Sequence, residues 1–399
     1  MKSRTPEIGV RRRVTYALIM FGFVALALGG MAELGARFYL GRVLEKSTQR
    51  KFRFNSYRVY EHVPGFREGD GARDWIVIDE HGFRRTEPVA KQKPPNTFRV
   101  FLLGGSAAHG ISSAPPYPVR HIYPDETIDA HLEAKLEALS DGRDVEVINA
   151  AVTGYQVFQH TAYLTSELLD YAPDLVVFLD GANDHYVNNP EHQYQGDFVY
   201  QFWKRRLQRP SAVGLFDYTA LWASRHSAFF RGAFAWRLQK DARSNRSEVD
   251  AVVTYETQAD LLAGHRAAAR RGFLRAIEAN LVILNAAGVD AIVALQPMLV
   301  LRDPAMLSDA ERAFLRPQPH IVDLYPTVVD EVRAVAEENG AEFIDTNPAF
   351  DDPALRGRQL LIDYCHLSPE GGAVVADVLL PLVHGKMRTR IAALDPQVR

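Results

Sequence analysis

Ser106 stands in a segment whose composition suits a nucleophilic hydroxyl presented at a tight turn. The segment follows an apolar run and reads Gly104-Gly105-Ser106-Ala107-Ala108-His109-Gly110. Its glycines allow a sharp strand-to-helix turn, and the small residues after Ser106 let a substrate approach the hydroxyl. Such a turn also directs backbone N–H groups outward, where an oxyanion could be held. Alone, a glycine-rich turn is more often structural, and without a Walker or GxGxxG pattern it gives no support for nucleotide binding.

A carboxylate and an imidazole lie three residues apart near the carboxyl end, in Asp363-Tyr364-Cys365-His366. On a helical turn, this spacing places Asp363 and His366 on the same side. The carboxylate could then orient the imidazole, whose other ring nitrogen takes a proton from a serine. Cys365 is interpreted as a packed thiol, because adjacent residues point apart on a helical turn and His366 would be poorly placed to activate it. By itself, such a pair is more often a surface pair or a structural cap.

Two further segments end apolar runs with residues that can present N–H donors. Gly154 follows the second run, in Asn149-Ala150-Ala151-Val152-Thr153-Gly154-Tyr155, and Asn183 follows the third, in Asp180-Gly181-Ala182-Asn183-Asp184-His185. Asp184 is interpreted as a carboxylate that stabilises this turn rather than as a catalyst. His109 and His185 could join Asp184 at a metal ion, but no HxH or HExxH spacing is present, so no metal site is predicted.

The elements that must position these residues follow a repeated strand–helix pattern. Short apolar runs occur at Val100–Leu103, Val145–Ile148, Leu175–Leu179, Ala291–Leu295 and Phe343–Ile344. With helical windows between them, these runs predict five parallel strands covered by helices on both faces. Ligands of open parallel sheets bind beyond the carboxyl ends of the strands. The segments of Ser106, Gly154 and Asn183 follow strand ends and are therefore candidates for one site.

The helical windows are recognised by apolar residues at helical spacing. They contain Ile128, Leu132, Leu136 and Leu139; Val157, Thr161, Leu164 and Leu168; Phe273, Ile277, Leu281 and Leu284; Val328, Val332 and Val335; and Val374 and Val378. Gly288 and Gly340 follow two of them as expected C-terminal caps. Ser368 and Pro369 precede the last window as the expected N-cap and first helical residue.

Together, the four segments resemble the SGNH hydrolase family, also called GDSL-type esterases and lipases. The resemblance covers roughly residues 97–386. It implies a flavodoxin-like, three-layer α/β/α fold, with Ser106 as nucleophile, His366 as general base and Asp363 as its partner. It also implies an oxyanion hole formed by the Ser106 and Gly154 N–H groups and the Asn183 side-chain amide. The family chemistry needs no metal or organic cofactor.

One departure from the family pattern concerns the residue before the serine. The usual Gly-Asp-Ser is here Gly104-Gly105-Ser106, so the family aspartate is absent. That aspartate is not the proton-transfer partner of the histidine. Its loss therefore weakens the family label more than the expected mechanism.

The amino end predicts a membrane anchor. Residues 1–13 carry five basic side chains and one acidic side chain, and the next 19 residues, 14–32, carry no charge. As a helix, this stretch would span close to the roughly 30 Å hydrocarbon core of a bilayer. It is longer than the usual hydrophobic region of a signal peptide. A retained transmembrane signal-anchor is preferred to a cleaved signal or a buried soluble helix.

The orientation of this anchor follows from the size of what comes after it. Basic residues flank the span equally, five before it and five within about 20 residues after it. A short basic tail resists translocation, whereas a large carboxyl-terminal domain crosses largely regardless of its charge. We therefore expect the catalytic domain to lie outside the cytoplasmic membrane.

Two regions fall outside the strand–helix pattern. Residues 33–96 are polar and poorly periodic, and are interpreted as a membrane-proximal approach segment. Residues 186–262 form an aromatic-rich insertion that contains Tyr194, Phe198, Tyr200, Phe202, Trp203, Phe229, Phe230, Phe234 and Trp236. The insertion is either a helical element with its own small core or a lid, or membrane-apposed cap, over the active site.

Composition excludes several classes of protein. The formal net charge is −3, which argues against a general nucleic-acid binder. Hydrophobic residues make up 47% of the chain and charged residues 24%, so global disorder is excluded. The single cysteine, Cys365, excludes an intramolecular disulfide and a zinc site built from several thiolates.

These observations predict a membrane-anchored serine esterase that forms an acyl-enzyme on Ser106. An anchored domain outside the membrane would meet cell-envelope or secreted glycans and lipids, and of these a short acyl ester, such as acetyl on a polysaccharide, is preferred to a long-chain lipid. The same acyl-enzyme would serve an O-acyltransferase if a sugar hydroxyl replaced water. A catalytically silent glycan-binding or assembly protein is the alternative from another class.

Overall fold

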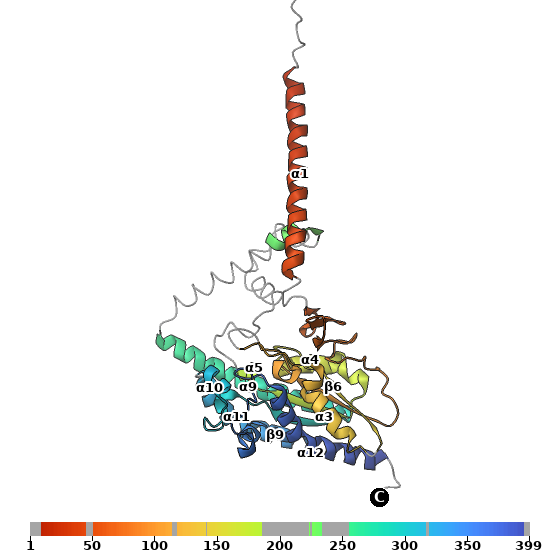
Figure 1. Cartoon of the computed structure of the whole chain (residues 1–399), viewed down its shortest axis with the longest axis vertical. Helices are drawn as coiled ribbons and strands as arrows, with labels where there is room; N and C mark the ends of the chain where they lie inside the picture. The colour runs from red at the N-terminus through yellow and green to blue at the C-terminus, as the bar shows by residue number, and fades with distance from the viewer. Residues whose placement is uncertain are drawn as a thin grey trace, which may run out of the picture. The chain divides into compact units, whose positions relative to one another are not determined.

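The computed structural model of the chain describes residues 9–44, 51–113, 118–140, 142–185, 223, 226–233, 255–316 and 319–394. The chain divides into two compact units (Figure 1). One consists of residues 51–197 and 254–399, and the other of residues 1–50 and 198–253. The larger unit contains the four segments singled out above.

The larger unit is built around a parallel sheet of five strands. The strands are β5 (Thr97–Gly104), β6 (Asp144–Asn149), β7 (Leu175–Asp180), β8 (Asp290–Leu295) and β9 (Glu342–Asp345), in the order β6-β5-β7-β8-β9. Each strand contains one of the five apolar runs, and all four pairings are parallel. This is the doubly wound, flavodoxin-like order, which confirms the predicted fold.

Helices cover both faces of the sheet, because alternate side chains of each strand point to opposite sides. In β5, Phe101 and Leu103 enter one buried cluster, whereas Val100 and Leu102 enter the other. Helices α4 (Val157–Ser166), α9 (Tyr255–Ala287) and α11 (Pro319–Glu338) contribute to the first cluster. Helices α3 (Ile128–Glu137) and α12 (Pro369–Leu394) contribute to the second and contact each other (Figure 1). The layers are therefore α/β/α.

The predicted helix ends have the expected local chemistry. Ser368 Oγ accepts a hydrogen bond from the Gly371 N–H (3.0 Å) and so caps the start of α12. Gly288 and Gly340 follow α9 and α11 with φ of 67° and 71°, in the left-handed region that favours glycine. The remaining short helices in the described part of the chain are α2 (Ser106–His109), α5 (Ala182–His185), α10 (Asp309–Phe314), η2 (Pro124–Glu126), η3 (Leu168–Tyr171), η5 (Leu299–Leu301), η6 (Asn347–Asp351) and η7 (Pro353–Leu355).

Residues 51–96 belong to the same unit as the sheet. They form two antiparallel pairs, β1 (Phe52–Asn55) with β2 (Val59–His62) and β3 (Arg67–Gly69) with β4 (Asp74–Val77). Arg84 shows how tightly this region is joined to the rest, because its buried guanidinium donates to the carbonyls of Gly110 (2.7 Å) and Ile122 (2.9 Å). The hydropathy pattern did not indicate these strands.

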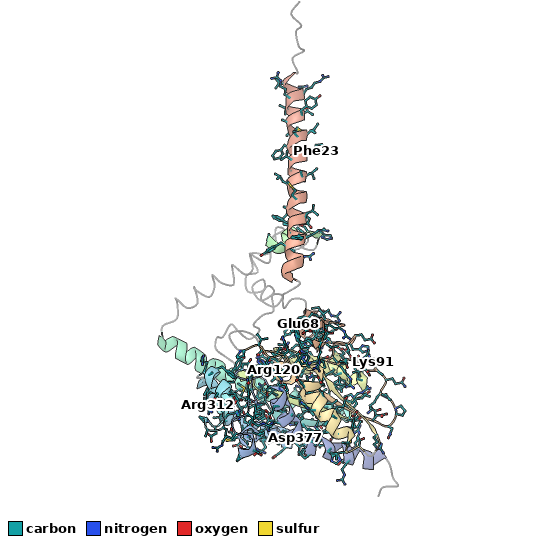
Figure 2. The ribbon with its side chains drawn as sticks, viewed as in Figure 1. Phe23, Glu68, Lys91, Arg120, Arg312 and Asp377 are labelled. Carbon is teal, nitrogen blue, oxygen red and sulfur yellow. The ribbon has the colours of Figure 1, made fainter. Side chains whose placement is uncertain are left out.

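The smaller unit contains α1 (Val10–Leu44) and a short described stretch at residues 226–233. Within α1, Val10–Tyr39 is long and apolar enough to cross a membrane, with a mean hydropathy of 2.0 and none of the tested window buried. Phe23 projects from the helix and is 69% exposed (Figure 2). Such a helix near the amino terminus is also compatible with a signal sequence. Of the predicted insertion, residues 186–222, 224–225 and 234–254 lie outside the described residues.

Candidate active site

Ser106, His366 and Asp363 form a continuous chain of hydrogen bonds. Ser106 is the first residue of α2, directly beyond the carboxyl end of β5. Its Oγ lies 2.7 Å from His366 Nε2, and His366 Nδ1 lies 2.6 Å from Asp363 Oδ2. Because an ionised carboxylate can only accept, Nδ1 carries the proton toward Asp363 and leaves Nε2 of a neutral imidazole free to accept from the serine. The arrangement can activate a hydroxyl for acyl transfer.

A tight loop, rather than a helical turn, brings Asp363 and His366 together. The Ile362 N–H donates to the carbonyl of His366 (2.9 Å), and α12 begins only at Pro369. Asp363 Oδ1 accepts from the backbone N–H groups of Cys365 (3.0 Å) and His366 (2.8 Å), so the carboxylate is fixed by its own loop. The spacing of three residues works here because the chain folds back on the aspartate.

This loop corrects the expectation that Cys365 points away from His366. Cys365 is buried, as expected for a packed thiol, but its Sγ lies within 4.8 Å of ligand atoms of Asp363 and His366. The expectation assumed a helical turn, in which the side chains of adjacent residues point apart. In the folded-back loop, Cys365 and His366 do not point apart in this way. These three atoms could together ligate a metal ion, although the imidazole and carboxylate are already joined to each other and to Ser106.

Asn183 lies directly against the turn that carries the serine. It belongs to α5, beyond the end of β7, and its Nδ2 donates to the carbonyl of Tyr155 (2.8 Å). A Cβ added at Gly105 would clash with that amide nitrogen. A side chain at position 105 would therefore require the Asn183 amide to shift from its place in this structure.

Gly154 lies on the loop after β6, beside the same turn. The Val152 N–H donates to the carbonyl of Gly104 (3.1 Å), which joins the start of this loop to the end of β5. Gly154 has a φ of 83°, and a Cβ there would lie 2.8 Å from Tyr60 Oη. The structure therefore brings the loops of Ser106, Gly154 and Asn183 to one edge of the sheet, as strand order requires.

A match to a protein family shows which reaction class this arrangement serves. The model of the GDSL-like lipase/acylhydrolase family matches residues 102–374, more than half of the chain. The chain belongs to this family. It is a serine hydrolase that acts on esters. No curated protein sequence matches significantly.

Several solved structures resemble this GDSL-like hydrolase. A catalytic mutant of an acetylxylan esterase from Geobacillus stearothermophilus is 13% identical, with a TM-score of 0.41, and the match covers 72% of this chain and 94% of that one. An α/β hydrolase from the metagenome of Lake Arreo, Spain, is 19% identical, with a TM-score of 0.37 and coverages of 73% and 96%. A crystallised Bacteroides fragilis protein, described as a putative acylhydrolase, is 11% identical, with a TM-score of 0.38 and coverages of 75% and 92%.

Two buried carboxylates, Asp180 at the end of β7 and Asp184 on α5, lie near the buried His160 of α4. Asp184 Oδ1 accepts from the N–H of Val157 (3.2 Å), the first residue of α4, so this bond joins α5 to the start of α4. Burial, followed by the charge of Asp180, raises the pKa of Asp184 well above its ordinary value. Asp180 in turn lies 3.1 Å from Nε2 of the buried His160. His160 was not identified from the sequence, because only the helix–strand packing brings it to Asp180.

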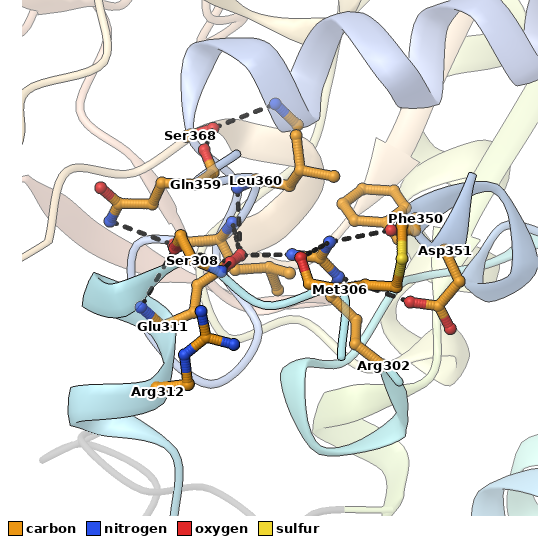
Figure 3. Close-up of polar contacts among 12 residues, drawn as sticks. Arg302, Met306, Ser308, Glu311, Arg312, Phe350, Asp351, Gln359, Leu360 and Ser368 are labelled. Atoms are coloured by element: carbon orange, nitrogen blue, oxygen red, sulfur yellow. Dashed lines mark hydrogen bonds and ion pairs between the residues drawn. The ribbon is translucent and has the colours of Figure 1, made fainter. Parts of the chain in front are cut away.

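A buried ion pair supports the histidine loop of this hydrolase (Figure 3). Glu311 Oε1 accepts from Arg302 Nη1 (2.6 Å) and from the N–H groups of Leu360 and Leu361 (3.0 Å each). Its Oε2 accepts from the N–H of Ser308 (2.9 Å). The carboxylate therefore fixes the chain three residues before Asp363. Sequence reasoning missed this support because Leu360 and Leu361, through which Glu311 holds the loop, lie 49 and 50 residues away along the chain.

The rate of this hydrolase should rise with pH above the ordinary pKa of histidine. Burial lowers the pKa of His366, but Cys365 and the hydrogen bond to Asp363 outweigh it and raise the value to about 10. Burial opposes ionisation of Asp363, but the hydrogen bond and charge of His366 favour it. The net effect lowers the pKa of Asp363. If His366 is the general base, Ser106 can transfer its proton only to the neutral imidazole, and proton loss from His366 should switch activity on. We expect the acid limb of kcat/KM, measured on a soluble p-nitrophenyl ester, to lie above pH 6.5.

The matched variant for this pH profile is Asp363→Asn. It removes the carboxylate that helps to hold the proton on His366, so the limb should move to lower pH while the maximal rate falls. A wild-type limb at or below pH 6.5, or a limb unmoved in Asp363→Asn, would contradict the electrostatic account of His366.

Proposed function

We propose that this hydrolase is a membrane-anchored esterase that removes short acyl groups, chiefly acetyl, from a cell-envelope or secreted glycan through an acyl-enzyme on Ser106. The observation that carries the proposal is the hydrogen-bonded chain from Ser106 Oγ through His366 to Asp363, with distances of 2.7 and 2.6 Å. That chain is the geometry by which a neighbouring base activates a weak nucleophile.

In the proposed acylation step, Ser106 Oγ attacks the ester carbonyl and its proton passes to His366 Nε2. Asp363 stabilises the imidazolium that forms and keeps its orientation. The negative oxygen of the tetrahedral intermediate is held by the N–H groups of Ser106 and Gly154 and by Asn183 Nδ2. Collapse of the intermediate releases the alcohol, which takes the proton from His366. Water then attacks the acyl-enzyme by the same route and regenerates Ser106.

The anchoring part of the proposal rests on α1. Its apolar stretch is long enough to cross a bilayer, and every proposed catalytic residue lies beyond residue 100, in the other compact unit. Residues 1–40 can therefore be deleted without removing any part of the sheet or of β1–β4. A carboxyl-terminal reporter that is active only outside the cytoplasm reads the orientation, and we expect it to give a signal.

Deletion of residues 1–40 should release a soluble protein with kcat/KM on a freely diffusing ester within about threefold of the full chain. Activity on a membrane-proximal polymer should fall more, because anchoring raises the local concentration of enzyme at its target. The measurement compares full-length enzyme in detergent with the truncated enzyme on p-nitrophenyl acetate. A truncated protein that stays in the membrane fraction, or a signal from a cytoplasm-only reporter, would contradict the anchor as proposed.

The substrate part of the proposal is tested by product analysis. Purified enzyme is incubated with an O-acetylated polysaccharide, with and without a deacetylated glycan acceptor, and free acetate is compared with newly acetylated acceptor. The esterase account expects free acetate in both cases. Acetate that appears on the acceptor at the expense of hydrolysis would make the protein an O-acyltransferase. Faster cleavage of octanoyl than of acetyl p-nitrophenyl esters would reject the short-acyl preference.

A further inference from the structure

We infer that Tyr60, in the β1–β2 hairpin that follows the anchor helix in sequence, is a positioning residue that orients the oxyanion-binding peptide of Gly154. The inference rests on the proposed function of that peptide. The hairpin lies outside the region matched by the family model, which begins at residue 102. It is nevertheless part of the same compact unit as the sheet.

Tyr60 acts on the peptide unit that contains the proposed donor. Its Oη donates a hydrogen bond to the carbonyl of Thr153 (2.9 Å). That carbonyl and the N–H of Gly154 belong to one planar trans peptide, so they point in opposite directions. Fixing the Thr153 oxygen toward Tyr60 therefore aims the Gly154 N–H away from Tyr60. The bond also polarises the peptide, which strengthens the N–H as a donor.

The backbone conformation of Gly154 makes this contact specific. Its φ of 83° and the 2.8 Å separation between a hypothetical Cβ and Tyr60 Oη mean that the phenol occupies the space beside the α-carbon. A side chain at position 154 would be strained and would collide with Tyr60. Glycine is thus required both by the turn and by the close approach of this hydroxyl.

Tyr155 connects the hairpin to the second proposed donor. Its hydroxyl donates a hydrogen bond to the carbonyl of Tyr60, and its ring packs edge-on against the Tyr60 ring with centroids 5.2 Å apart. The carbonyl of Tyr155 accepts from Asn183 Nδ2 (2.8 Å). Tyr155 is fully buried, so these bonds are shielded from water. The hairpin therefore contacts the Gly154 loop directly and Asn183 through one residue.

His62, two residues after Tyr60 on β2, extends the same surface to the nucleophile helix. Side chains two apart on a strand share a face. The His62 ring lies 4.6 Å from that of His109, the last residue of α2, whose first residue is Ser106. Burial lowers the pKa of His62 to about 3 and that of His109 well below its ordinary value, so both rings are neutral. The contact is apolar packing that adds no charge beside the site.

The test is Tyr60→Phe in the full-length protein, which removes one hydroxyl and keeps the ring. Loss of a single neutral hydrogen bond that acts on a transition-state donor should lower kcat on p-nitrophenyl acetate about 5- to 10-fold, with KM within about twofold. A trifluoromethyl ketone, which forms an oxyanion when a serine adds to it, should bind more weakly by a similar factor. Tyr57→Phe is the control, because Tyr57 lies on the same hairpin and is 76% exposed.

A double-mutant cycle distinguishes positioning from general destabilisation. Gly154→Ala should lose less activity in the Tyr60→Phe background than in the wild type, because the added methyl group no longer meets the hydroxyl. Equal fractional losses in the two backgrounds overturn the inference, as does a Tyr60→Phe enzyme with unchanged kcat or with a loss confined to KM. If the wild-type chain neither turns over esters nor reacts at Ser106, the proposed function itself has failed.

Discussion

Replacement of Ser106 by alanine should reduce kcat/KM on a small ester by a factor of about 10⁵ or more, the loss typical of removing a serine nucleophile. The Ser106 hydroxyl hydrogen-bonds to His366 Nε2, and in the variant Asp363 and His366 remain held by their own loop. The fold should therefore survive. Purified variant and wild type are compared by steady-state hydrolysis of p-nitrophenyl acetate and by circular dichroism. Ser166→Ala, at an exposed position on α4, is the matched control.

Two results would count against the role of Ser106. Undiminished hydrolysis by a folded Ser106→Ala protein would mean that another group forms the acyl-enzyme or that none is formed. Full complementation of a deletion strain by the same variant would instead favour a catalytically silent assembly or glycan-binding protein. The two results are separable, because the first is measured on purified enzyme and the second in cells.

Asn183→Ala should lower kcat by about 10²–10³ and change KM little, as is usual when one oxyanion donor is removed. Asn183 Nδ2 is fixed against Gly105 and donates to the Tyr155 carbonyl (2.8 Å), which leaves its second N–H to stabilise developing charge. The backbone carbonyl of Asn183 accepts from Gln156 Nε2 (3.1 Å), and this bond is unaffected by alanine. The local structure should therefore persist.

The control for this variant is Asn285→Ala, which removes an exposed amide from α9, far along the chain from the site. If the kcat values of Asn183→Ala and Asn285→Ala both stay within about threefold of wild type, the Asn183 amide only packs against the Gly105 turn. A loss that appears in KM alone would assign Asn183 to substrate binding instead.

The sheet was predictable because its strands are buried along their length. In β7, all six residues from Leu175 to Asp180 are buried, and such a strand is recognised as a short continuous apolar run. The helices were predictable for the complementary reason: Leu132, Leu136, Leu281 and Leu284 repeat at helical spacing and are all buried. Parallel order then placed the loops of Ser106, Gly154 and Asn183 at one edge.

Residues 51–96 were not predictable in the same way. Their strands have only three or four residues each, which is too short to establish a period. Their buried positions include Arg58, His62 and Arg84, whose polar types normally indicate a solvated surface. The two guanidinium groups hydrogen-bond to partners far along the chain, as in the bonds from Arg58 Nη2 to Glu167 Oε2 (2.7 Å) and from Arg84 Nη1 to the carbonyl of Gly110 (2.7 Å).

The sequence was sufficient to propose the residues of the candidate site, but it did not indicate the residues that hold their loops in place. The spacing of Asp363 and His366 was sufficient to propose the pair, although the chain achieves it with a folded-back loop. Glu311 and Tyr60, which hold that loop and the Gly154 peptide, act over separations of about 50 and 93 residues. No local pattern marks such contacts, because they depend on the packing of elements that are distant in sequence.

Labelling with a fluorophosphonate tests most directly whether Ser106 is an activated nucleophile. The probe reacts with serines that a neighbouring base has activated, and it requires no knowledge of the natural substrate. Intact-mass and peptide analysis of the full-length protein should find one modification, on Ser106, that is lost in Ser106→Ala and strongly slowed in Asp363→Asn. A modification on another residue, or none on an enzyme that hydrolyses esters, would contradict the account.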